Sequence, residues 1–203
     1  AEIDQSLSYV RFVPINEIAG SSRPFSIKIA KPALAICLRH SHMCVSRSVY
    51  VLEGTKLKIA QIAPLMESVP PRLYGGTERI VSYLTEELVG LGHEVTLFAS
   101  GDSITAANLV PCVPKALRLD ASVRDPIPYY MLMLDRVRQR VDDFDVLHFH
   151  IDQFHFPLFR PIASSTLTTL HGRQDLPDLR PLYFGFNDMP LVSISDNQRA
   201  PIH

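Results

Sequence analysis

The sequence has no tryptophan and only three cysteines among its 203 residues. Cys37, Cys44 and Cys112 form neither the paired spacing of a metal site nor the even set of a disulfide framework. Free thiols are typical of a reducing compartment, where cysteine packs as a small hydrophobic residue. We therefore expect buried free thiols and a cytoplasmic protein.

A surplus of charge of either sign is also missing. The chain has 20 lysines and arginines against 21 aspartates and glutamates, which gives a formal net charge of -1. Proteins that bind nucleic acid or an acidic membrane surface normally carry a basic surplus. The composition therefore predicts no nucleic-acid partner, and it leaves a local, peripheral contact with a membrane open.

Long hydrophobic runs and the common phosphate-binding motifs are absent as well. The apolar stretch at residues 33–38 is too short to span a bilayer and lies too far from the amino terminus for a signal peptide. Neither a Walker A motif nor G-x-G-x-x-G is present. We expect no transmembrane segment, no P-loop nucleotide hydrolase and no ordinary NAD-dependent oxidoreductase.

What the sequence does contain is a run that reads strand, Gly-Gly turn, helix and strand. Residues 57–63 are mostly apolar, as in a strand buried in a parallel sheet, and Gly75 and Gly76 follow in a loop. A helix then ends at Gly92, where a left-handed cap is common, and residues 93–99 read as the next strand. The predicted helix exposes Arg79, Ser82, Glu86 and Glu87 and buries Ile80, Val81, Leu84, Leu88 and Leu91.

The alternation of strands and helices continues to the end of the chain. Residues 107–113 read as a strand that Pro111 and Pro114 place at an edge, and residues 127–141 read as a helix. The expected apolar face of that helix is Ile127, Tyr130, Met131, Leu134, Val137 and Val141. Further strands are expected at residues 145–150, 166–170 and 191–195. The pattern predicts an α/β fold with a doubly wound, mostly parallel, Rossmann-like sheet.

The beginning of the chain looks different. Residues 1–56 mix serine, arginine, histidine and proline and show no lasting period of a strand or a helix. We therefore expect an irregular leader or extension at residues 1–56, outside the fold, and one domain at residues 57–203.

The Gly75-Gly76 turn has two interpretations. A glycine-lined helix start offers free backbone N–H groups and the positive end of the helix dipole, so a phosphate can bind there without a lysine. Many such turns carry glycine only for tight geometry, and Glu78 disfavours a nearby anion unless its side chain points away. Both interpretations stay open from the residues alone.

Two histidines near the end of one predicted strand could carry chemistry. In a strand at residues 145–150, His148 and His150 share one face, and His150 stands at the carboxyl end. We expect His148 to be a satisfied core histidine and His150 to reach the ligand crevice, where a neutral imidazole can bind a hydroxyl group. His171 and Gly172 should reach the same edge after the next strand, either as a turn or as part of the crevice.

The histidine pair also allows a metal site. His148, His150 and Asp152 match H-x-H-x-D, the start of the metal signature of the metallo-β-lactamase fold. Gln153 stands where that pattern requires a further histidine, and those hydrolases open with antiparallel strands. A metal-dependent hydrolase is therefore the less favoured alternative, and we expect no metal.

The motifs together resemble a known family. They are KIAQIAPLMESVPPRLYGGTERIVSYLTEELVGLGHEVTLFASGDS at residues 58–103, DVLHFH at 145–150, LTTLHG at 167–172 and VSIS at 192–195. They closely resemble bacterial family 4 glycosyltransferases, which have the GT-B architecture of two Rossmann-like domains facing a cleft. The resemblance covers about three quarters of the chain and excludes its beginning.

The resemblance implies a function and a set of site residues. It implies the amino-terminal, acceptor-side domain of a retaining transferase that moves a sugar from a nucleotide-diphosphate donor to a hydroxyl acceptor, without a cofactor. In this family Gly75 and Gly76 would approach the donor phosphate, and His150 would face the transferred sugar as the catalytic residue. The residues that line the acceptor side of the cleft would be Asp102, His171, Gly172 and Ser195.

The family also has a second domain, which carries the nucleotide site. We expect the chain to lack this carboxy-terminal donor domain, because it stops at His203, and to be inactive on its own. A non-catalytic carbohydrate- or nucleotide-binding module stays open as the alternative.

Overall fold

The computed structural model describes residues 28–30, 33–35, 56–118 and 120–202. Two of these segments, β1 (Lys28–Ala30) and β2 (Ala33–Ala35), pair antiparallel with each other and join no other described strand. They lie in the segment for which the sequence predicts irregular structure, and the role of that segment as a leader stays a prediction. Cys37 and Cys44 lie outside the described residues.

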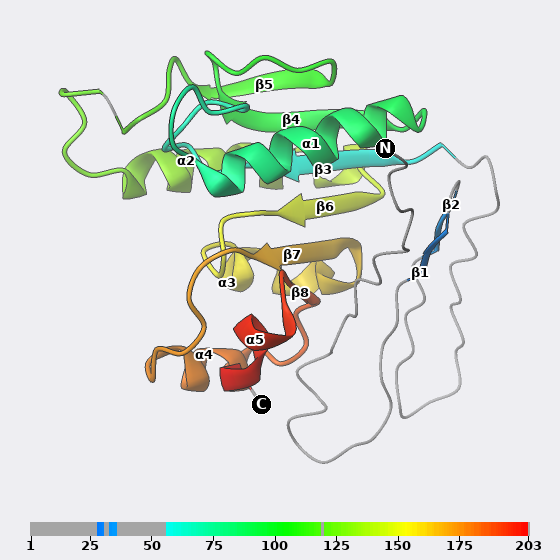
Figure 1. Cartoon of the computed structure of the whole chain (residues 1–203), viewed down its shortest axis with the longest axis vertical. Coiled ribbons are helices and arrows are strands. Elements are labelled where there is room, and N and C mark those ends of the chain that lie inside the picture. Colours follow the sequence, from blue (N-terminus) through cyan, green and yellow to red (C-terminus); the bar gives the residue numbers. More distant parts are fainter. Residues whose placement is uncertain (1–27, 31–32, 36–55, 119, 203) are drawn as a thin grey trace, which may run out of the picture.

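The rest of the described chain is built on a six-stranded, fully parallel sheet (Figure 1). In chain order its strands are β3 (Lys58–Ile62), β4 (Glu94–Ser100), β5 (Asn108–Val113), β6 (Val146–Phe149), β7 (Thr166–Leu170) and β8 (Leu191–Ser193). Their spatial order is β5-β4-β3-β6-β7-β8, with β5 at an edge as its prolines predict. The predicted doubly wound Rossmann-like fold is confirmed.

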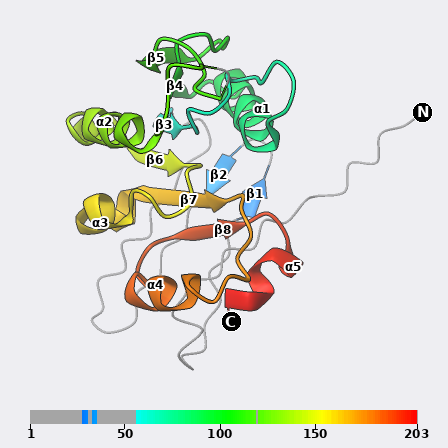
Figure 2. The same ribbon diagram turned by 90° about the vertical axis from the view of Figure 1, so that its left-hand side faces the viewer.

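Helices cover both faces of this sheet (Figure 2). α1 (Gly76–Gly90) lies on one face, and α2 (Ile127–Arg138) and α3 (Phe156–Phe159) lie on the other. The shorter helical segments are α4 (Leu179–Gly185), α5 (Asp196–Arg199), η2 (Val141–Asp143), η3 (Arg160–Ser165) and η4 (Ala200–Ile202). None of the helices in the described ranges has both the length and the apolar character needed to cross a membrane.

Alternate residues of each strand face the two helical layers. On the α2 side, the largest cluster joins strand residues such as Ile62, Phe98 and Phe149 to Leu134 and Val137 of α2. On the α1 side, Leu97 of β4 packs with Val81 of the helix in one smaller cluster, and Ile59 and Val95 pack with Leu88 in another. The core therefore lies in two layers around the sheet, which holds the strand ends in fixed positions.

The buried face of α1 differs from the prediction. Ile80 and Leu91 are 49% and 48% exposed, whereas Ser82 and Thr85 are buried. The contact stripe consists of Glu78, Val81, Ser82, Thr85 and Leu88. Small polar side chains let the helix approach the sheet closely, and a prediction based only on apolar residues places the face on the wrong side.

The start of α2 departs from its prediction in the same way. Ile127 and Met131 are 51% and 65% exposed, and Met133, which the predicted stripe omits, is buried with Leu134 and Val137. The helix also ends at Arg138 rather than at Val141, which begins η2.

Two other local predictions concern Gly92 and Cys112. Gly92 has φ 89°, its N–H donates to the carbonyl of Val89, and the N–H of His93 donates to that of Leu88, which is a Schellman cap and confirms the predicted left-handed end. Cys112 is a free, half-buried cysteine, and burial raises the pKa of its thiol to about 11.

Candidate functional site

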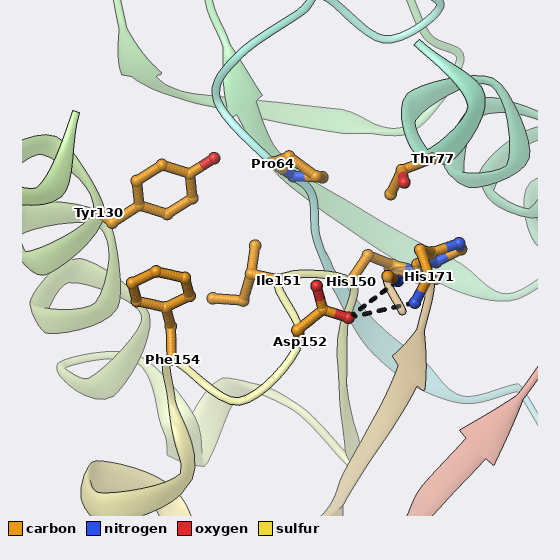
Figure 3. A pocket seen from close by; sticks show the side chains of 9 residues that line it. Pro64, Thr77, Tyr130, His150, Ile151, Asp152, Phe154 and His171 are labelled. Atoms are coloured by element: carbon orange, nitrogen blue, oxygen red, sulfur yellow. Dashed lines mark hydrogen bonds between the residues drawn. The ribbon is translucent and has the colours of Figure 1, made fainter. Parts of the chain in front are cut away.

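A pocket lies where the strand order reverses. The sheet grows outward from β3 through β4 and β5, and then resumes on the other side of β3 with β6. In open α/β sheets, the crevice at such a switch point is where ligands bind. The pocket has a volume of about 240 Å³. It is lined by Pro64, Thr77, Tyr130, His150, Ile151, Asp152, Phe154, His171 and Gly172 (Figure 3).

One end of the pocket is aromatic. The rings of Tyr130 and Phe154 stack with centroids 5.6 Å apart and planes 18° from parallel (Figure 3). The N–H of Leu65 donates to the Tyr130 hydroxyl over 3.1 Å, which holds this ring against the loop after β3. Burial raises the pKa of Tyr130, so the hydroxyl stays neutral. Because Ile151 and Pro64 lie between the aromatic and polar ends, much of the wall is apolar.

Asp152 organises the opposite, polar end. Its Oδ1 accepts hydrogen bonds from the N–H groups of His171 (3.1 Å) and Gly172 (3.4 Å) (Figure 3). Its backbone has φ 48°, a left-handed conformation that aspartate tolerates better than most residues. A Cβ on Gly172 would lie 3.2 Å from Asp152 Oδ2, so glycine keeps this approach open. The carboxylate therefore joins the end of β6 to the turn after β7.

His150 and His171 belong to a row of hydrogen-bonded polar side chains on the α1 side of the sheet. This row, called the polar file below, consists of His171, His150, Gln61, His148 and Thr169. His150 Nδ1 lies 3.0 Å from His171 Nε2, and His150 Nε2 lies 2.8 Å from Gln61 Oε1. Gln61 Nε2 lies 3.5 Å from His148 Nδ1, and His148 Nε2 lies 2.8 Å from Thr169 Oγ1. The file crosses three neighbouring strands or their ends, and Gln61, His148 and His150 are buried.

These histidines are neutral near pH 7. Burial, with a smaller contribution from the nearby His171, lowers the pKa of His148 to about 3. Burial also lowers the pKa of His150 well below its ordinary value, with His148 and His171 adding to the effect. For His171, burial lowers the pKa and the Asp152 carboxylate opposes it. A neutral imidazole has one donor and one acceptor nitrogen, so the file can orient hydroxyl groups without carrying charge.

The histidine predictions agree with this geometry. His148 and His150 share one face, with ring centroids 4.1 Å apart, and His148 is buried with a partner at each nitrogen, as expected of a core histidine. His150 and His171 both line the pocket at the sheet edge, together with Gly172. His150 is only 2% exposed, so His171 presents more of its ring to the pocket.

The Gly75-Gly76 turn lies beside the pocket rather than in its wall. Gly75 precedes α1 with φ 152°, and a Cβ there would meet Pro71 Cβ at 2.7 Å and Glu78 Oε2 at 2.9 Å. Gly76 has open space around it, and Thr77 is the residue of this turn that lines the pocket. The buried Glu78 carboxyl folds back toward Gly75, and burial raises its pKa. Phosphate binding by the two glycines stays a prediction.

Two predicted cleft residues lie away from the pocket. The carboxylate of Asp102 accepts a hydrogen bond from the N–H of Ala116 over 3.0 Å, in the loop after β5. The hydroxyl of Ser195 accepts from the N–H of Gln198 over 3.1 Å and caps α5. Neither residue lines the pocket. Both side chains instead hold local backbone, and their role in binding an acceptor stays a prediction.

The three side chains of the H-x-H-x-D pattern are not arranged around a common centre. His148 and His150 are directed to Thr169 and Gln61, and Asp152 is directed to backbone N–H groups. Within the part of the chain that the structure describes, no cluster of three histidine, cysteine, aspartate or glutamate residues is placed to hold a metal.

Two residues that line the pocket, and Gln61 behind it, belong to no motif that predicts a site. Tyr130 reads as part of an apolar helical stripe, Phe154 as a loop residue, and Gln61 as a polar residue among the apolar residues 59–63 of a strand. Only the last is a signal, because an amide in a strand that is buried on both faces must find hydrogen-bond partners. Gln61 is fully buried between His148 and His150.

The solved structures that are similar to this chain include the following two. One is AviGT4, a glycosyltransferase involved in avilamycin A biosynthesis, with 22% identity and a TM-score of 0.36, over 57% of this chain and 32% of that chain. The other is the C-terminal domain of the coenzyme A biosynthesis bifunctional protein CoaBC, with 13% identity and a TM-score of 0.43, over 73% of this chain and 78% of that chain. This chain thus spans 32% of the length of the glycosyltransferase.

A family model matches the chain, whereas the curated protein sequences do not. No curated protein sequence matches the chain. The sequence model of Glycosyltransferase Family 4 matches residues 74–191, which is more than half of the 203 residues. The matched range includes α1, the β6 histidines and the His171-Gly172 turn. The chain belongs to Glycosyltransferase Family 4.

Proposed function

We propose that this domain is the acceptor side of a retaining glycosyltransferase, which moves a sugar from a nucleotide-diphosphate donor to a hydroxyl group. The observation that carries the proposal is the pocket at the switch point of a family 4 domain, with imidazoles and a carboxylate at one end and stacked aromatic rings at the other. Hydroxyl groups bind to the polar end, and the apolar face of a sugar or its aglycone packs on the aromatic end.

The two histidines at the polar end of the pocket have different roles. His171 is half-buried and offers ring atoms to a bound hydroxyl group, whereas His150 is buried behind it and bonds to His171 Nε2. We assign His150 to the orientation of His171 and to close contact with the transferred sugar. Asp152 fixes the His171-Gly172 backbone, so the distance between the imidazole and the carboxylate is set before a ligand arrives.

The charge of the donor diphosphate requires a partner outside this pocket. The nine lining residues include no lysine or arginine, and the carboxylate of Asp152 repels an anion. The helix dipole at the start of α1 supplies only part of the neutralisation. We therefore propose that a donor-binding domain supplies the basic groups, and that the described domain alone does not transfer sugar.

The test is a transfer assay with the natural polypeptide that carries this domain. Release of nucleoside diphosphate is followed over a panel of nucleotide sugars and hydroxylated acceptors, and NMR of the product gives the anomeric configuration. His150→Ala and His171→Ala should each lower kcat/KM at least tenfold, and the product should keep the configuration of the donor. His93→Ala, which removes a histidine that precedes β4 and lies outside the pocket, is the matched control.

Two outcomes would overturn the proposal. Normal transfer by both histidine variants would show that the pocket does not take part in the reaction. Tight binding of a carbohydrate or nucleotide without any transfer, by a polypeptide with its donor domain present, would favour the alternative of a binding module.

A further inference from the structure

Gln61 occupies a position that its surroundings do not explain by packing. It lies on the central strand β3, is 0% exposed, and is the only polar residue of Ala60–Ala63. Its amide bridges two imidazoles, with Oε1 2.8 Å from His150 Nε2 and Nε2 3.5 Å from His148 Nδ1. A leucine would fill the same volume without the cost of burying an amide.

The amide oxygen determines where the protons of the histidines lie. A carbonyl oxygen can only accept, so His150 Nε2 carries the proton and donates to Gln61. A neutral His150 then has a bare Nδ1, which accepts from His171 Nε2–H over 3.0 Å. A neutral His171 in turn has a bare Nδ1. Each step follows from the one before, because a neutral imidazole has one proton for two nitrogens.

The amide nitrogen of Gln61 continues the same direction of hydrogen-bond donation toward His148. Gln61 Nε2 donates to His148 Nδ1, so His148 Nε2 carries its proton and donates to Thr169 Oγ1 over 2.8 Å. Along the whole polar file, each side chain therefore donates a hydrogen bond to the next one, in the direction from the pocket to Thr169. Rotation of the amide by half a turn would reverse every hydrogen bond and leave an N–H at His171 Nδ1.

We infer that Gln61 is a positioning residue that makes His171 accept, rather than donate, hydrogen bonds at the polar end of the pocket. The inference rests on the proposed function and names the ligand group that the site selects. His171 Nδ1 and Asp152 Oδ2 have no hydrogen-bond partner within the described ranges, and both accept. They match a group that donates, such as a sugar hydroxyl, and they disfavour a phosphate or carboxylate oxygen.

The proton positions can be observed directly. Long-range proton–nitrogen NMR of the folded chain with labelled histidines distinguishes the two neutral forms of each imidazole. In the wild type, His148, His150 and His171 should all be protonated at Nε2. Protonation of His150 at Nδ1 in the wild type would overturn the inference, and this readout needs no transfer reaction.

Two substitutions separate positioning from packing. In Gln61→Glu, both oxygens accept, so His148 should change to the Nδ1-protonated form while His150 keeps its proton at Nε2. In Gln61→Leu, His150 and His171 should each become a mixture of both forms. Gln174→Leu is the matched control, because Gln174 is also buried but bonds to Tyr183 and Gly172 rather than to a histidine. Unchanged forms in both Gln61 variants would overturn the inference.

The expected preference for ligands that donate hydrogen bonds is tested with two probes. A methyl glycoside presents hydroxyl donors, and its fully O-methylated counterpart presents acceptors only. The wild type should prefer the free glycoside, and Gln61→Leu should reduce this preference about fivefold, which corresponds to one neutral hydrogen bond. An equal preference in both proteins would overturn the selection. Absence of binding to either probe, with all three histidines protonated at Nε2, would instead count against the proposed function alone.

Discussion

The imidazole rings of His148 and His150 lie side by side on one strand end, with centroids 4.1 Å apart and planes tilted by 40°. Two positive charges this close in a buried site would repel strongly, so the pair functions without charge. The four hydrogen bonds along their file supply each ring with partners that suit the neutral form. The pair therefore acts by orientation rather than by electrostatic attraction.

The stability of the domain should fall in mild acid. The pKa of His148 and that of His155 are lowered to about 3, against 6.5 for an ordinary histidine, with burial as the main cause. Between these values the unfolded chain binds protons that the folded chain does not, so this stability is complete above pH 6.5 and is lost as the pH falls. We expect a loss of about 1.4 kcal/mol per pH unit for each histidine.

Urea denaturation from about pH 7 to pH 4 measures this slope. The His155→Leu variant removes one of the buried neutral histidines, and its slope should be lower than that of the wild type by about 1.4 kcal/mol per pH unit. An identical slope in both proteins would show that His155 is not buried in its neutral form.

The two glycines of the turn before α1 should respond in opposite ways to alanine. Gly75→Ala places a Cβ 2.7 Å from Pro71 Cβ at a φ of 152°, so we expect a loss of about 2 kcal/mol or more in the free energy of unfolding. Gly76→Ala meets no atom within 4 Å, and it should be neutral or add up to about 1 kcal/mol. Chemical denaturation of the two variants compares them, and similar losses would contradict the structure of this turn.

Asp152 should be replaceable by asparagine but not by alanine. Asp152→Ala removes the acceptor for two backbone N–H groups and leaves a left-handed φ of 48°, which should cost about 2 to 4 kcal/mol. Asparagine keeps an oxygen acceptor and tolerates this backbone, so Asp152→Asn should cost about 1 kcal/mol or less. Thermal or chemical denaturation of the pair measures the difference, and equal losses would mean that the acceptor and the backbone angle do not matter.

The aromatic end of the pocket should contribute to binding more than to stability. Phe154 is 52% exposed and stacks on Tyr130, so Phe154→Ala should weaken binding of a glycoside about fivefold while leaving the unfolding transition nearly unchanged. Phe184→Ala is the control, because Phe184 is 75% exposed and does not line the pocket. Titration calorimetry measures both. A similar change in glycoside affinity in the two variants would show that the Tyr130–Phe154 stack is not part of the binding site.

The order of strands and the position of the crevice were predictable because they depend on local signals. The β7 strand coincides with its predicted range, and the other strands differ by one or two residues at their ends. His150, His171 and Gly172 follow from the rule that the carboxyl ends of parallel strands meet at one edge. The same rule places Asp102 and Ser195 at strand ends, but it cannot tell which strand ends border the pocket.

Other features depend on contacts between distant residues. The stack of Tyr130 on Phe154 joins a helix to a loop, and neither residue type is unusual in its place. The role of Gln61 requires strands β3 and β6 in a fixed register, in which Gln61 lies opposite His148. Helix faces were mispredicted where Ser82 and Thr85 fill the contact, because hydrophobicity does not measure size.

The polar file also constrains how the sheet can assemble. Side chains alternate along a strand, so a slip of one residue between β3 and β6 would turn either Gln61 or His148 away from its partner and into the apolar layer. An unpaired buried amide costs about 1 to 3 kcal/mol, and an unpaired imidazole costs a similar amount. Parallel strands made only of aliphatic residues have no such penalty for a shifted pairing. The histidines and Gln61 therefore make correct strand alignment a condition for a stable core.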